Sequence, residues 1–307
     1  MSAENDATPI IINGKKSSQK IRDWVKIEII KLRESYNFIP GLAVILVGED
    51  PASKIYVNNK EKQSLEVGMN SWKYRLPAES SEKKIIDQIH KLNSDDLVDG
   101  ILVQLPLPEK SSASERLIIS EINPDKDVDG LHIINAGKLV SGENGLFPAT
   151  PSGCLHLLRE YFSDLSGKKA LVIGRSNLVG KPIANMLLNQ NCTVTMAHSK
   201  TKNLINECRQ ADIIVAAIGI PEFIKSDWLK KESIIIDVGI NRIENSNSSK
   251  SHLVGDVDYQ GAIKICKAIT PVPGGVGPMT IASLLLNTLK AACVRRNLEP
   301  PIFDFTS

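Results

Sequence analysis

Two side chains in the first quarter of the chain have the types and spacing needed for proton transfer. Tyr56 and Lys60 are four positions apart, so on a helix they lie on one face. A lysine whose pKa is lowered by partial burial can move protons near neutral pH, and a neighbouring phenol can assist it. The same spacing also fits the polar face of a solvated amphipathic helix, so the pair alone leaves both interpretations open.

Other polar residues occur where α/β proteins bind ligands. Gln104 stands near the end of the apolar run 100–105, and an amide there can contact a ligand or satisfy a backbone group. The segment 125–130, DKDVDG, resembles a calcium loop superficially, but the downstream glutamate of an EF-hand is missing. This segment is more typical of a turn that offers one carboxylate.

The segment 174–182, GRSNLVGKP, lies between an apolar run and a helical pattern. It does not match the dinucleotide fingerprint G-x-G-x-x-G, because Ser176 replaces the second glycine and the third is displaced to Gly180. Its place between strand and helix nevertheless suits phosphate binding at a helix N-terminus. An ordinary turn is the alternative interpretation.

The end of the next expected strand indicates which nucleotide such a site would take. Enzymes that use NAD place an acidic residue there for the ribose 2′-hydroxyl, whereas residues 198–201 are His-Ser-Lys-Thr. A hydroxyl, a lysine and Arg175 would suit a 2′-phosphate, and therefore NADP. A polar strand end with a solvated lysine fits equally well.

Two series of alternating strands and helices must position these residues. The first contains helices at 16–35, 53–67 and 81–93 and strands at 43–48, 71–76 and 100–105. The second contains strands at 169–174, 193–197, 212–216 and 233–237, a helix at 178–190 and a closing helix after Thr280. The polar run 245–251 predicts a surface loop, and the segment 271–280 predicts a rigid loop rich in proline and glycine. The alternation predicts two α/β units with parallel sheets, joined near residue 150.

The composition limits the classes of function. A chain of 307 residues suits two domains, and 42% hydrophobic with 23% charged residues is typical of soluble globular proteins. The net charge of +2 and 5% aromatic residues give no reason to expect nucleic-acid or membrane partners.

Five cysteines and five histidines are scattered, without C-x-x-C or H-E-x-x-H, so we expect reduced thiols and no metal. The first six residues lack the features of a signal peptide, and we find no apolar run approaching the roughly 18 residues of a membrane span. We therefore expect a soluble, cytoplasmic protein.

Taken together, these segments resemble the family of bifunctional methylenetetrahydrofolate dehydrogenase/methenyltetrahydrofolate cyclohydrolases. The matching segments occur in family order and extend over nearly the whole chain. They are 48–53, Tyr56, Lys60, 103–107, 125–130, 135–137, 148–151, 174–176, 179–182, 198–199, 237–242, 255–257 and 271–280.

The resemblance implies a homodimer whose subunits have two α/β domains with a cleft between them. Residues 1–150 would form a folate-binding catalytic domain, to which a closing helix at 279–307 would return. Residues 151–278 would form a Rossmann-like NADP-binding domain.

The resemblance also assigns roles to individual residues. Lys60 would be the main catalytic group, supported by Tyr56 and Gln104, and Asp129 would hold the pterin ring. The implied substrate contacts are Asp129, Tyr56, Lys60, Pro273 and Gly274. The implied cofactor contacts are Gly174, Arg175, Ser176, Ser199 and Ile240.

The implied reaction is oxidation of 5,10-methylenetetrahydrofolate with NADP, followed by hydrolysis of the methenyl product to 10-formyltetrahydrofolate. Such an enzyme belongs to one-carbon metabolism and purine biosynthesis, and the cationic methenyl carbon is electrophilic without a metal. A monofunctional dehydrogenase would be distinguished by a missing catalytic lysine or glutamine, and both are present here. A regulatory nucleotide-binding module would not need Tyr56, Lys60, Gln104 and Asp129 together.

Overall fold

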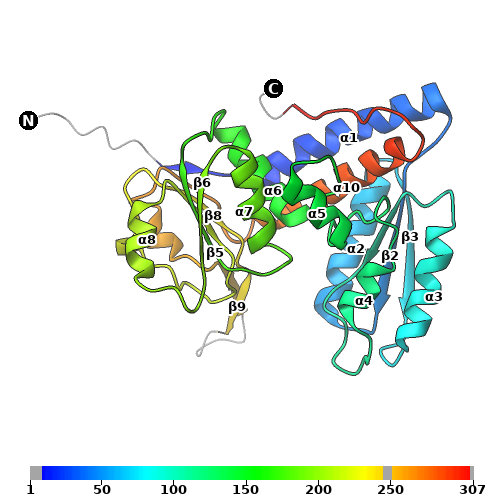
Figure 1. Ribbon diagram of the computed structural model, residues 1–307, viewed down its shortest axis with the longest axis horizontal. Coiled ribbons are helices and arrows are strands. Elements are labelled where there is room, and N and C mark those ends of the chain that lie inside the picture. Colours follow the sequence, from blue (N-terminus) through cyan, green and yellow to red (C-terminus); the bar gives the residue numbers. More distant parts are fainter. Residues whose placement is uncertain (1–8, 245–250, 305–307) are drawn as a thin grey trace, which may run out of the picture. The chain divides into compact units, whose positions relative to one another are not determined.

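The structure is a computed structural model in which residues 9–244 and 251–304 are described (Figure 1). It divides into two compact units, each with its own parallel sheet. The three-stranded unit contains Gln19–Ala149 and Ile281–Asp304, and the six-stranded unit contains Thr150–Thr280 with the described residues before Gln19. The predicted α/β class with parallel sheets is confirmed.

In the three-stranded unit the central strand β2 (Gly41–Val47) is buried along its whole length. It pairs in parallel with β3 (Asn70–Leu76) on one side and β4 (Gly100–Val103) on the other. Alternate residues of β2 face opposite layers, as strand geometry requires. Ala43, Ile45 and Val47 pack with Ile85 and Ile89 of one helix, while the intervening residues pack with other helices.

Helices cover both faces of this sheet. They are α1 (Gly14–Tyr36), α2 (Pro51–Glu66), α3 (Glu82–Asn93), α4 (Glu115–Ser120), α5 (Ile133–Ser141) and the later part of α10 (Val276–Val294). Helix α2 begins before the predicted Ser53, because the Asp50 side chain caps it by accepting from the Ser53 backbone nitrogen at 2.7 Å. Gly68, at φ +89°, follows its end.

The six-stranded sheet has the order β1-β11-β8-β7-β5-β6, and all its pairings are parallel. Its strands are β1 (Ile10–Ile11), β5 (Lys169–Ile173), β6 (Thr193–Ala197), β7 (Ile213–Ala216), β8 (Ile234–Asp237) and β11 (Ala268–Ile269). The connecting elements are α6 (Ala149–Tyr161), α7 (Gly180–Asn189), α8 (Leu204–Gln210), the 3-10 turn η1 (Ser226–Trp228), α9 (Tyr259–Ala262) and the antiparallel hairpin β9 (Asn241–Glu244) and β10 (Ser251–Val254). Except for Ser251, the predicted loop 245–251 lies outside the described residues, as do the first six residues considered for a signal peptide.

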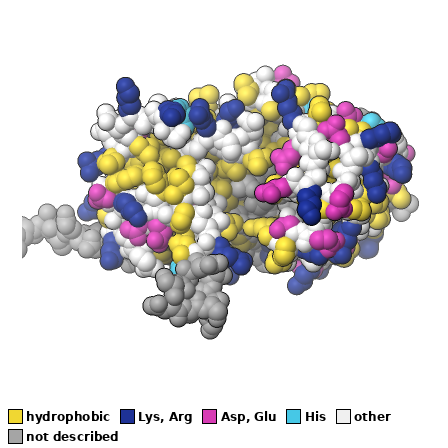
Figure 2. Space-filling view, turned by 90° about the horizontal axis from the view of Figure 1, so that it is seen from below, with side chains coloured by type: hydrophobic (Ala, Val, Ile, Leu, Met, Phe, Trp, Pro, Cys, Tyr) yellow, Lys and Arg dark blue, Asp and Glu magenta, His cyan; other side chains and the backbone are white. Residues whose placement is uncertain are grey.

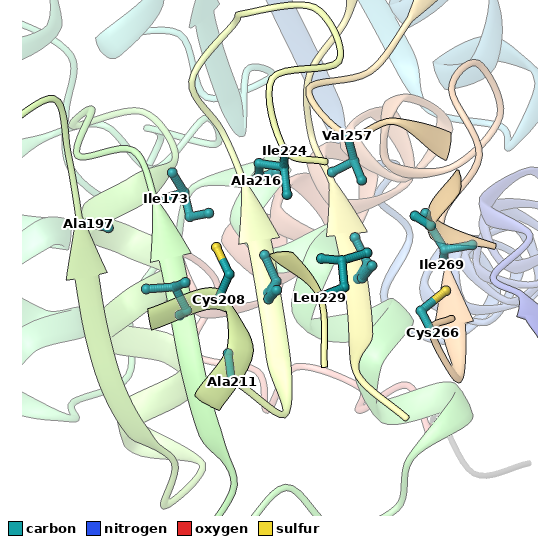
Figure 3. Close-up of a cluster of buried hydrophobic side chains, with 14 residues drawn as sticks. Ile173, Ala197, Cys208, Ala211, Ala216, Ile224, Leu229, Val257, Cys266 and Ile269 are labelled. Carbon is teal, nitrogen blue, oxygen red and sulfur yellow. The ribbon is translucent and has the colours of Figure 1, made fainter. Parts of the chain in front are cut away.

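A core of aliphatic side chains lies on one face of this sheet. Figure 3 shows Ile173 of β5, Ala216 of β7 and Ile269 of β11 in one cluster of buried side chains that also contains Cys208 and Leu229. Because these strands are covered on both faces, their sequences are continuous apolar runs.

Strand β1 departs from the predicted domain boundaries. The sequence places residues 1–150 in the first domain, but Ile10 and Ile11 pair with Ala268 and Ile269 in the six-stranded sheet. Two residues are too few to show a period, and their partner lies more than 250 positions away. Neither fact can be read from the local sequence.

Helix α10 belongs mainly to the three-stranded unit. Asn287 donates to the carbonyls of Val128 and Phe147 at 2.8 Å, and Lys290 donates to that of Gly145 at 2.8 Å. It is the one helix in the described chain that is long and apolar enough to cross a membrane, with a mean hydropathy of 1.2. Since 67% of that window is buried inside the protein, its apolar character is that of a core helix.

Candidate active site

The candidate catalytic amine lies on the inner side of α2. Lys60 is only 7% exposed, and its Nζ donates to Oε1 of Gln104 at 2.9 Å. The amide of Gln104 is oriented by its other end, since Nε2 donates to the carbonyl of Leu105 at 2.7 Å. Strand β4 ends at Val103, and the turn that follows presents this amide oxygen to the lysine. Tyr56, one helical turn before Lys60, is 43% exposed.

The loop that carries Asp129 is anchored by two preceding residues, Lys126 and Asp127. Lys126 is buried, and its amine donates to the carbonyls of Leu92, Asn93 and Asp95 at 2.8–3.0 Å. The carboxylate of Asp127 is also buried and accepts from the backbone of His132 at 2.8 Å and from the amide of Asn135 at 3.0 Å. The hydrogen bonds of these two buried side chains therefore hold the loop in place. Asp129, which is half-buried, is not needed for this anchoring and can make other contacts.

Lys60 and Asp129 act on each other electrostatically. Burial lowers the pKa of the Lys60 amine, and the Asp129 carboxylate opposes this effect. Burial raises the pKa of Asp129, and the Lys60 ammonium opposes it in turn. An amine that loses its proton more readily than a solvated lysine can act as a base and return the proton as an acid. Within the described residues, no group of three or more histidine, cysteine, aspartate or glutamate side chains could hold a metal ion.

The glycine turn between β5 and α7 brings two backbone segments very close together. Gly174 has φ +121°, and a Cβ there would lie 2.1 Å from the carbonyl oxygen of Ala217. A Cβ on Gly180 would lie 2.2 Å from the carbonyl oxygen of Gly174. Both positions therefore require glycine. Ser176 holds the turn, because its Oγ accepts from the backbone nitrogens of Val179 and Gly180 at 3.1 and 3.3 Å.

Arg175 and Ser199 follow two neighbouring strands at the same edge of the sheet. Ile173 pairs with Ala197, and the backbone nitrogen of Gly174 donates to the carbonyl of Ala197 at 2.9 Å. Both the guanidinium and the hydroxyl are exposed. This arrangement places a cation and a hydroxyl beside a backbone-lined turn, as anion binding requires.

The remaining predicted site residues also lie in the six-stranded unit. Ile240 follows β8 and is 48% exposed, and a Cβ on Gly277 would lie 3.8 Å from its Cδ1. Pro273 is exposed, and Gly274, at φ +111°, accepts through its carbonyl from the Lys15 backbone nitrogen at 3.1 Å.

The structure thus assembles the predicted residues in two groups. Tyr56, Lys60, Gln104 and Asp129 lie in the three-stranded unit, and the predicted cofactor residues, with Pro273 and Gly274, lie in the six-stranded unit. The buried carboxylates of Asp237 and Asp256 have no role predicted from the sequence, although the short motifs D-x-G at 237–239 and G-D at 255–256 mark their positions.

The fold and these two candidate sites define a two-unit α/β enzyme of the nucleotide-dependent dehydrogenase class. Two family models match the chain: the catalytic domain of tetrahydrofolate dehydrogenase/cyclohydrolase over residues 12–129, and the NAD(P)-binding domain of the same enzymes over residues 148–296. The chain belongs to the tetrahydrofolate dehydrogenase/cyclohydrolase family.

Relatives match over nearly their full length. Bifunctional protein FolD of Cereibacter sphaeroides is 54% identical over 290 residues, which cover 94% of this chain and 97% of that protein. Bifunctional protein FolD 2 of Paracoccus denitrificans is 52% identical over 303 residues, which cover 99% and 98%.

Solved structures agree in fold. The bifunctional enzyme FolD of Campylobacter jejuni is 47% identical with a TM-score of 0.88, covering 93% of this chain and 99% of that one. The enzyme of Trypanosoma brucei, whose structure contains NADP and an inhibitor, is 34% identical with a TM-score of 0.88, covering 94% and 98%.

Proposed function

We propose that this protein oxidises 5,10-methylenetetrahydrofolate to 5,10-methenyltetrahydrofolate with NADP and then hydrolyses the product to 10-formyltetrahydrofolate. The observation that carries the proposal is the buried amine of Lys60, which donates to Gln104 and interacts electrostatically with Asp129. Membership of the family and the full-length similarity to bifunctional relatives support both activities.

The hydrolytic step is the one that requires proton transfer. Water must lose a proton as it adds to the methenyl carbon, and the departing ring nitrogen must gain one. Lys60 suits both tasks, since burial favours its neutral form and Gln104 holds its nitrogen in place. Tyr56, on the same helix face, and Asp129 are proposed to hold the folate beside it, with Pro273 and Gly274 supplying backbone contacts.

The glycine turn fits a dinucleotide phosphate, because Gly174 and Gly180 leave a surface of backbone without room for a Cβ. Gly174, Arg175, Ser176, Ser199 and Ile240 are the residues proposed to hold NADP. Arg175 and Ser199 would take the 2′-phosphate, since residues 198–201 contain no acid to bind a free ribose. Bound there, the nicotinamide supplies the hydride acceptor for the oxidation.

The cellular setting is also a proposal. The resemblance supports a cytoplasmic homodimer that acts on tetrahydrofolate derivatives without nucleic-acid or membrane partners. Its 10-formyl product would serve purine biosynthesis. On the face shown in Figure 2, basic and acidic side chains are interspersed, in keeping with the net charge of +2.

A paired assay on the purified protein tests the reaction. NADPH formation from 5,10-methylenetetrahydrofolate measures the first step, and loss of the methenyl absorbance measures the second. We expect both to depend on the enzyme. NADPH formation with no enzyme-dependent loss of the methenyl absorbance would exclude the cyclohydrolase, and failure to form NADPH would exclude the dehydrogenase.

A further inference from the structure

Two buried carboxylates interlock at the carboxyl edge of the six-stranded sheet. Asp237, the last residue of β8, is 3% exposed, and Asp256, just after β10, is fully buried. Oδ1 of Asp237 accepts from the backbone nitrogens of Gly239 and Asp256 at 3.0 and 2.9 Å, and Oδ2 accepts from that of Val257 at 2.9 Å. The side chain of Asp237 therefore fixes the backbone that carries Asp256.

Asp256 in turn connects two loops. Its Oδ2 accepts from the backbone nitrogens of Ile218 and Gly219, which follow β7, at 2.7 and 3.0 Å. Its Oδ1 accepts from the side-chain amide of Asn241 at 2.9 Å. Asn241 directly follows Ile240, so a single carboxylate ties the loop after β7 to the segment after β8.

Glycines allow this close packing. A Cβ on Gly239 would lie 2.2 Å from Oδ1 of Asp256, and a Cβ on Gly255 would lie 1.9 Å from Oδ2 of Asp237. Each carboxylate is therefore seated against a glycine of the other's segment. A buried carboxylate is tolerated only where donors replace its hydration, and here backbone and amide N–H groups do so.

The carboxylate network continues to the glycine turn. Ile218 follows Ala217, whose carbonyl oxygen lies so close to Gly174 that a Cβ there would be 2.1 Å away. Figure 3 shows Ile224 and Val257 lying together near Ala216, at the end of β7, where Ile224 and Val257 form a bridge. Thus the turn after β5, the loop after β7 and the segment after β8 form one packed layer, and Asp256 joins the last two.

We propose that Asp256, through Asn241 and the backbone of Ile218 and Gly219, is a positioning residue for the nucleotide half of the reaction. It holds Ile240 and the loop after β7 in register with the glycine turn, so that the cofactor surface is formed before the cofactor arrives. The inference rests on the proposed function, since it assumes that NADP binds at this edge. The cyclohydrolase step uses no nucleotide and supplies an internal reference.

A reciprocal exchange of the two side chains tests this role. Asn241→Asp puts a second carboxylate against Oδ1 of Asp256 and replaces attraction by repulsion. Asp256→Asn added to it restores a donor facing an acceptor, with the roles reversed, while the new amide oxygen still accepts from Ile218 and Gly219. Asn206→Asp makes the same chemical change on the exposed surface of α8 and serves as the matched control.

The readouts are the Kd for NADP by titration, both activities and the melting temperature. We expect Asn241→Asp to weaken NADP binding about tenfold or more, the size of effect of a bond to a charged group. The double variant should recover to within about threefold of the wild type, and the cyclohydrolase rate should change far less than the dehydrogenase kcat/KM.

Wild-type NADP affinity in Asn241→Asp would overturn the proposal. So would a double variant that melts like the wild type yet stays weak, or a parallel loss of both activities, which would indicate a role in folding alone. If the wild-type protein itself failed to bind NADP, the proposed function would fall together with this inference. The two failures are therefore distinguishable.

Discussion

Replacement of Lys60 by methionine should separate the two reactions, because the proposed mechanism uses the amine in only one of them. Methionine keeps the length and apolar stem of the side chain, which is 7% exposed. The hydrogen bond to Gln104 is lost, and an unsatisfied buried acceptor costs about 1–3 kcal/mol. Removal of the buried amine offsets part of this cost. We therefore expect a folded protein whose Tm falls by a few degrees, at about 2–4 °C per kcal/mol.

The catalytic effect should be much larger and unequal. General acid–base catalysis contributes roughly 10²–10⁴-fold, so Lys60→Met should lower the cyclohydrolase rate by at least about 100-fold. Hydride transfer depends mainly on alignment of the two bound molecules, so the dehydrogenase should fall less. Its loss measures how far Lys60 also positions the folate.

The assay follows both activities in the same preparation. Lys62→Met, two positions along the same helix and exposed, provides the matched control and should leave both rates near those of the wild type. Lys60→Arg keeps a positive charge that does not dissociate near neutral pH and should also lack cyclohydrolase activity. Near wild-type hydrolysis by a folded Lys60→Met variant would refute the assigned role.

Three further predictions follow from the same geometry. Arg175→Ala should raise the KM for NADP by roughly 10–100-fold while barely changing that for NAD, and equal losses for the two cofactors would contradict a 2′-phosphate contact. Asp129→Ala should weaken folate binding about tenfold or more, measured as Kd, whereas Asp125→Ala in the exposed part of the same loop should not. Gln104→Glu places a carboxylate against the Lys60 amine and so raises the pKa of that amine. Since the neutral amine is the proposed base, the rising limb of the cyclohydrolase pH profile should move to higher pH, and a shift to lower pH would disprove the assignment.

Local patterns predicted most of the fold because buried parallel strands leave strong signals. The apolar run beginning at Ala43 and the helix containing Ile85 and Ile89 were both recognisable, and the structure adds only small changes in their ends. The start of α2 was misplaced because both Asp50 and Ser53 are common capping residues. Only the backbone conformation decides between them.

Long-range pairing could not be predicted in the same way. Strand β1 contributes only two residues to the six-stranded sheet, and the strand with which it pairs, β11, is distant in the sequence. The contacts of Asp256 could not be predicted either, since its three donors come from Ile218, Gly219 and Asn241 on two different segments. The sequence shows a short G-D pair there but not the distant backbone that the carboxylate contacts.

Lys60 and Lys126 are both buried lysines, and they show why residue type alone does not identify a catalytic group. Burial lowers the pKa of Lys126 to about 8 and also lowers that of Lys60. The amine of Lys126, however, donates hydrogen bonds to three backbone carbonyls at the end of α3. Transfer of its proton would therefore weaken the hydrogen bonds that hold the loop of Asp129. The amine of Lys60 has, among the described residues, one hydrogen bond, to Gln104, and it interacts electrostatically with the carboxylate of Asp129. Proton exchange at Lys60 therefore leaves the structure in place, and this difference in partners supports Lys60 rather than Lys126 as the catalytic group.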